Sequence, residues 1–162
     1  MIGTIERKVL KFDPQVYPFK VWVAQGVDFE YMSNNFYAFI DGFAVDITND
    51  MWDAEPNTKI IRVYPVVEKG SMLIGAIARI LQPEDVGVRT MAHEATHITD
   101  LMCEELGIDG CNYSYFGGEA RAYFAGWVAE CIDKALTAFN NQPIEEDDER
   151  EHEVLLYDKP PK

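Results

Sequence analysis

Hydrophobic and polar residues alternate in short runs along the first half of the chain. Aromatic and β-branched side chains are interleaved with polar ones, a period of two that is typical of strands with one buried face. Between two of these runs, Phe29, Met32 and Phe36 recur at intervals of three and four, which predicts a short helix over 28–40. The predicted strands are 5–12, 17–24, 43–48, 59–68 and 71–81.

The period changes to three or four residues in the second half. Pro83 suits the first turn of a helix and Gly107 suits a left-handed residue just past its end, so we predict one helix over 83–106. A loop follows, and a second helix is predicted over 119–139. The whole pattern predicts an α+β fold, with a mostly antiparallel sheet packed on two core helices in a single domain over 1–139.

Acidic residues dominate the composition and gather near the C-terminus. The 162 residues carry a formal net charge of −14, and 145–153 holds seven acids against one arginine. Such a segment has too little apolar surface to fold alone, so we predict a disordered acidic tail over 140–162. The charge also argues against nucleic acid and anionic membranes as partners, because both bind clusters of Lys and Arg.

Signals for export or membrane insertion are not recognisable in the sequence. The N-terminus lacks a basic stretch followed by an apolar core, and no apolar run approaches the roughly 20 residues that span a bilayer. The three cysteines match no zinc-knuckle or redox spacing, as expected of reduced thiols. We therefore expect a cytoplasmic protein, with export by another route left open.

The segment His93-Glu94-Ala95-Thr96-His97 lies in the middle of the first predicted helix. Two histidines four residues apart project from one face of a helix, about one turn from each other, as two ligands of a tetrahedral metal ion must. Glu94 lies beside them, where its carboxylate can accept a proton from a water in the open coordination position. The segment therefore predicts a zinc site with His93 and His97 as ligands and Glu94 as general base.

A catalytic zinc site has three protein ligands and one exchangeable position, so a third ligand is required. Glu119 opens the second predicted helix, and an antiparallel helix pair would bring its carboxylate back toward the histidines. Two other interpretations stay open. The histidines can be ordinary surface residues of a helix, or the metal can be purely structural.

These residues resemble the gluzincin class of zinc metallopeptidases. His93, Glu94 and His97 match the HExxH helix of that class, and Glu119 matches the glutamate that the next helix supplies. The chain is also similar, over about 70–139, to short single-domain HExxH proteins encoded by phages and prophages. The resemblance implies a two-helix zincin-like core, Zn²⁺ as cofactor, and hydrolysis of peptide bonds in a peptide or protein substrate.

The resemblance also implies where a substrate binds. In that class the strand before the metal helix is often a sheet edge that pairs with an extended substrate, which would place a peptide along 74–78, unless this strand is interior. Larger gluzincins stabilise the oxyanion with a Tyr or His from another lobe. The candidates for that role here are Tyr113, Tyr115, Arg121 and His152. A metal-stabilised interaction module without turnover and a metal-free binding domain are the alternatives to a peptidase.

Overall fold

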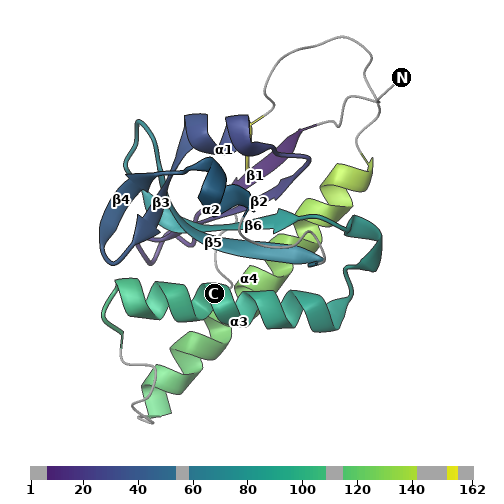
Figure 1. Cartoon of the computed structure of the whole chain (residues 1–162). Coiled ribbons are helices and arrows are strands. Elements are labelled where there is room, and N and C mark those ends of the chain that lie inside the picture. The colour runs from purple at the N-terminus through teal and green to yellow at the C-terminus, as the bar shows by residue number, and fades with distance from the viewer. Residues whose placement is uncertain (1–6, 54–58, 109–114, 142–152, 157–162) are drawn as a thin grey trace.

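Figure 1 shows the computed structural model of the chain, which describes residues 7–53, 59–108, 115–141 and 153–156. The described elements, in chain order, are β1 (Lys8–Phe12), β2 (Lys20–Gln25), α1 (Phe29–Asn35), β3 (Phe36–Ile40), β4 (Phe43–Asp46), α2 (Asn49–Asp53), β5 (Ile61–Glu68), β6 (Ile74–Ile80), the 3₁₀ turn η1 (Pro83–Asp85), α3 (Val88–Glu105), α4 (Tyr115–Asn141) and β7 (Glu153–Leu156).

The strands form one mixed sheet in the order β4-β3-β5-β6-β2-β1-β7. The pairings β1–β2, β3–β4, β3–β5 and β5–β6 are antiparallel, whereas β2–β6 and β1–β7 are parallel. Together with the helices, this arrangement confirms the predicted α+β class. The sheet is more mixed than predicted, because β2 pairs in parallel with β6, from which it is separated along the chain by α1, β3, β4, α2 and β5.

Helices cover both faces of the sheet. In Figure 1, α1 and α2 lie on one face and α3 and α4 on the other, where α4 crosses α3. Successive side chains of β2 serve the two cores in turn: Val21 and Val23 pack in the core shared with α3 and α4, while Trp22 packs against Met32 and Phe36. On its own face of the sheet, α3 contacts β5 and β6, and this contact positions the site described below.

The segment 28–40 is half helix and half strand, so the prediction of one helix is wrong for 36–40. α1 ends at Asn35, after a serine and two asparagines of low helix propensity. Asp41 and Gly42 follow with φ of 51° and 83° and join β3 to β4. Two residues with positive φ form the tight turn that suits a hairpin. The Asp-Gly pair was therefore the sequence signal for β3 and β4.

The two long helices differ from their predicted ranges at their first turns. Residues Pro83–Asp85 form only a 3₁₀ turn, and α3 begins after Gly87, which is extended at φ −113° and ψ 176°. α4 begins at Tyr115, four residues before Glu119. Glu119 therefore lies about one turn inside α4 and does not open it.

The prediction of a disordered tail is not confirmed for the short segment Glu153–Leu156. This segment is the strand β7, which pairs parallel to β1 with Leu10 opposite Val154. The rest of the predicted tail beyond Asn141 lies outside the described residues. Among the helices that the structure describes, none has the length and apolar content needed to cross a membrane.

Candidate functional site

The two histidines of the motif lie on the face of α3 that is turned away from the core. The buried residues of α3 are Ala95, Ile98, Thr99, Met102 and Cys103. His93 and His97 fall on the opposite side of the helical wheel from these positions and are both exposed, the His93 side chain by 65%. The packing of α3 against the sheet therefore fixes the direction in which both imidazoles project.

The imidazoles converge on one point. The two Nε2 atoms are 3.1 Å apart, and the rings meet edge to face at 79° with centroids 4.7 Å apart. Two Zn–N bonds of about 2.0–2.1 Å at a tetrahedral angle span about 3.3 Å between the nitrogens. The pair thus fits two positions of a tetrahedral zinc ion with a shift of only a few tenths of an ångström. The same distance also permits a hydrogen bond between the rings.

Glu94 is less exposed than the histidines that flank it. Its side chain is 13% exposed, and its Oε1 atom lies 3.9 Å from Nε2 of His93. Burial raises the pKa of the Glu94 carboxyl, against the opposing effects of the charges on His93, His97 and Lys59. A partly desolvated carboxylate beside two histidines spaced to bind a metal ion is suited to accept and return a proton.

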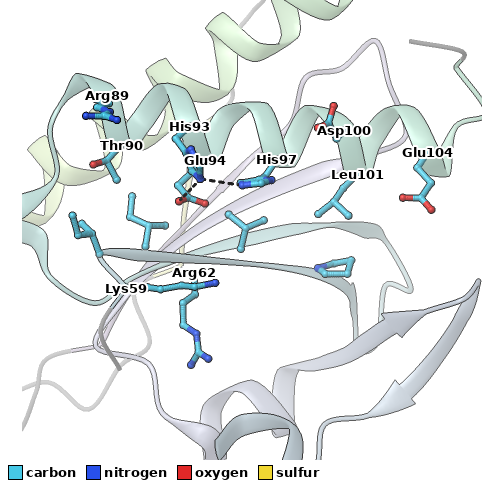
Figure 2. Close-up of a pocket in the computed structure, with 14 residues that line it drawn as sticks. Lys59, Arg62, Arg89, Thr90, His93, Glu94, His97, Asp100, Leu101 and Glu104 are labelled. Atoms are coloured by element: carbon cyan, nitrogen blue, oxygen red, sulfur yellow. Dashed lines mark hydrogen bonds and ion pairs between the residues drawn. The ribbon is translucent and has the colours of Figure 1, made fainter. Parts of the chain in front are cut away.

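A groove of about 770 Å³ runs between α3 and β5 and contains the motif. Figure 2 shows His93, Glu94 and His97 pointing from α3 toward β5. Residues 59–63 and Pro65 form the opposite wall. The groove has room for several residues of an extended chain, and the histidine pair lies in its wall.

One side of β5 is open along this groove. On that side β3 pairs only with Val66–Glu68, and no other strand among the described residues pairs with the stretch 61–65. The amide of Glu68 donates to Leu73 on the β6 side, and Ile60 accepts there from Leu81, so even-numbered residues of β5 bond toward β6. Peptide groups alternate sides along a strand. The odd-numbered Ile61 and Val63 therefore direct both N–H and C=O to the open side.

Pro65 is the last residue of the stretch 61–65 of β5, with which no described strand pairs on the open side. It is also odd-numbered, so its nitrogen faces the open side, where the lack of an N–H costs no ladder hydrogen bond. A proline inside a strand marks an edge, and this was the signal in the sequence that the prediction did not use. Lys59 and Arg89, which line the groove at one end, were not foreseen either.

The predicted edge strand is an interior strand. β6 pairs with β5 along its whole length on one side and with β2 over 75–80 on the other. Gly75 of β6 lies so close to β2 that a Cβ atom there would stand 1.9 Å from the carbonyl oxygen of Lys20. Peptide pairing along 74–78 is therefore wrong, because both edges of β6 are already occupied by strands.

Glu119 lies on the exposed side of α4. Arg121 of α4 faces α3, where it forms an ion pair with Asp100. Glu119 is two residues from Arg121, which is a rotation of about 200° around the helix and turns its side chain away from α3. Within the described ranges, no three His, Cys, Asp or Glu side chains form a group that could hold a metal. Glu119 as third ligand stays a prediction.

Of the four candidates for stabilising an oxyanion, the structure describes the side chain of Arg121 alone. Tyr113 and His152 lie outside the described residues, as does the side chain of Tyr115. Arg121 is engaged with Asp100. Among the described side chains, none is therefore assigned to this role.

Protein-family models, curated protein sequences and solved structures were each compared with the chain, and none of them matches it. The likeness to gluzincins therefore rests on His93, Glu94, His97 and Glu119 alone.

Proposed function

We propose that this protein is a zinc-dependent metallopeptidase that cleaves an extended peptide bound along the open side of β5. In this proposal His93 and His97 hold the metal, Glu94 is the general base, and Glu119 is the third ligand. The observation that carries it is the 3.1 Å approach of the two Nε2 atoms beside a partly buried Glu94. Both features lie in a groove next to an unpaired strand edge.

The chain's own residues suit each part of the reaction. Ile61 and Val63 offer N–H and C=O groups that can hold the substrate backbone as an added strand. Glu94 would accept a proton from the attacking water and return it to the leaving amine as the peptide bond breaks. When bound by the histidines, zinc would polarise the substrate carbonyl and lower the pKa of the water.

The experiment is metal analysis together with a peptide-library cleavage assay on the full chain. We expect about one zinc per chain and cleavage by the wild type. His97→Ala should lose the metal, whereas Glu94→Gln should keep the metal and lose turnover. Glu105→Gln is the matched control, because Glu105 is an exposed acid of α3 outside the groove. A protein without zinc, or metal content unchanged in His97→Ala, would refute the site.

One observation favours a second candidate, a metal-stabilised interaction module without turnover. The described residues gather two histidines but no third metal ligand, and a site with fewer than three protein ligands is poorly fixed for catalysis. The same variants separate the two functions. In an interaction module Glu94→Gln keeps full function, and in a peptidase it abolishes cleavage.

A further inference from the structure

The two ends of the groove carry opposite charge. Lys59 and Arg89 line the end where α3 and β5 begin, and Asp100 and Glu104 line the other end (Figure 2). The charge on Lys59 acts on Glu94, so the cationic end lies within electrostatic reach of the motif. The cationic end is notable in a chain with only 14 Lys and Arg against 28 Asp and Glu.

The acidic end depends mainly on Glu104. Asp100 forms an ion pair with Arg121, which offsets its charge. Glu104 is exposed, and no ion pair within the described ranges engages it. The groove therefore runs from a cationic end through the histidine pair to an anionic end.

The direction of a bound peptide follows from the sheet. Both described neighbours of β5, β3 and β6, pair with it in the antiparallel sense, and antiparallel pairing is the more stable kind per residue. An antiparallel peptide on Ile61 and Val63 would place its N-terminal part toward Glu104. Its C-terminal part would then lie toward Lys59 and Arg89.

We infer that the groove selects its substrate by charge order, with basic residues N-terminal and acidic residues C-terminal to the cleaved bond. The inference rests on the proposed function, because it assigns a substrate class to the same groove. The charges lie at the rim in contact with solvent. Each matched pair should therefore change affinity by up to about fivefold at low salt, and much less at high salt.

The test uses two labelled peptides of identical composition. One carries two arginines before and two glutamates after a central apolar pair, and the other carries them in the reverse order. Fluorescence anisotropy gives Kd for each with zinc-loaded Glu94→Gln, so the readout does not depend on turnover. We expect at least about fivefold tighter binding of the first peptide, and loss of this preference in 0.5 M salt.

Charge reversals locate the effect. In the Glu94→Gln background, Glu104→Lys and Arg89→Glu should each reduce the preference, and the double reversal should invert it. Glu105→Lys is the matched control: it makes the same charge change one residue away but outside the groove, and should leave the preference in place.

Three outcomes are decisive. Inversion by the double reversal supports the inference. Equal binding of both peptides by Glu94→Gln, with cleavage by the wild type, overturns the charge order and leaves the peptidase proposal standing. Absence of both binding and cleavage overturns the two together.

Discussion

A proline at position 63 tests whether the open side of β5 binds substrate. Val63 points its N–H to that side, and no described strand accepts it. Pro65, two residues on, already occupies an equivalent position in the native strand. Val63→Pro therefore removes one outward donor and no hydrogen bond of the β5–β6 ladder.

The magnitude follows from one hydrogen bond. A neutral backbone hydrogen bond contributes about 0.5–1.5 kcal/mol net, so loss of the Val63 donor should weaken peptide binding about two- to twelvefold. The free energy of unfolding should change by less than about 1 kcal/mol, because proline has a similar volume and suits an edge. In Tyr64→Pro the missing N–H would face β6, so the free energy of unfolding should fall by at least about 2 kcal/mol.

The assays are peptide anisotropy on zinc-loaded Glu94→Gln and urea denaturation of each variant. Val63→Ala controls for loss of the side chain, which is partly buried in the core under α3. The reasoning is refuted if Val63→Pro binds peptide as tightly as Val63→Ala. It is equally refuted if Val63→Pro unfolds as readily as Tyr64→Pro, since the N–H would then be part of the ladder.

The remaining predictions concern packing, acid stability and the third ligand. Gly75→Ala would place a Cβ atom 1.9 Å from the backbone oxygen of Lys20, so it should lower the free energy of unfolding in urea by more than about 3 kcal/mol. Gly126 has open space around it, so Gly126→Ala should raise the free energy of unfolding by about 0.5–1 kcal/mol. Burial raises the pKa of Asp13, but the hydrogen bonds from Lys20 and the Gln15 amide and the charges of Lys20 and Lys11 together outweigh it and lower the pKa. The stability that this ion pair contributes is present above the unfolded pKa of about 3.9 and is lost as the pH falls through the folded pKa. The urea midpoint of the wild type should therefore decrease between about pH 5 and about pH 2.5, and Lys20→Met should make this decrease smaller. An equal decrease in both proteins would contradict this. Glu119→Gln should weaken zinc binding by at least about tenfold in a chelator competition if Glu119 is the third ligand.

The sequence predicts the elements of this fold better than their arrangement. The strands β2, β5 and β6 fall largely within predicted ranges, because alternation and β-branched side chains are local properties. Their neighbours are not local. A glycine inside a strand usually weakens it, so the sequence alone gives Gly75 no structural role. In the structure, the lack of a side chain at Gly75 leaves room for the carbonyl of Lys20 in the parallel β2–β6 pairing.

The sequence likewise predicts the local geometry of the site better than the neighbours of its elements. The motif predicts that His93 and His97 share a face of α3, because the spacing within one helix fixes it. The sequence placed the open sheet edge on β6, whereas the open edge beside the motif belongs to β5, because strand order depends on which surfaces pack together and not on order along the chain. The proline at position 65 was the local clue to the edge.

The third ligand depends on how two helices face each other, which neither the motif nor the periodicity determines. Turning α4 by about half a turn would bring Glu119 toward α3. The same rotation would expose Phe124 and Val128, which are buried, at about 1.5–3 kcal/mol each. Glu119 can therefore reach the histidines only through a local change in the first turns of α4. Weaker zinc binding by Glu119→Gln, but not by the exposed control Glu130→Gln, would mean that the metal induces this change. Equal affinities would mean that the histidines hold zinc without Glu119.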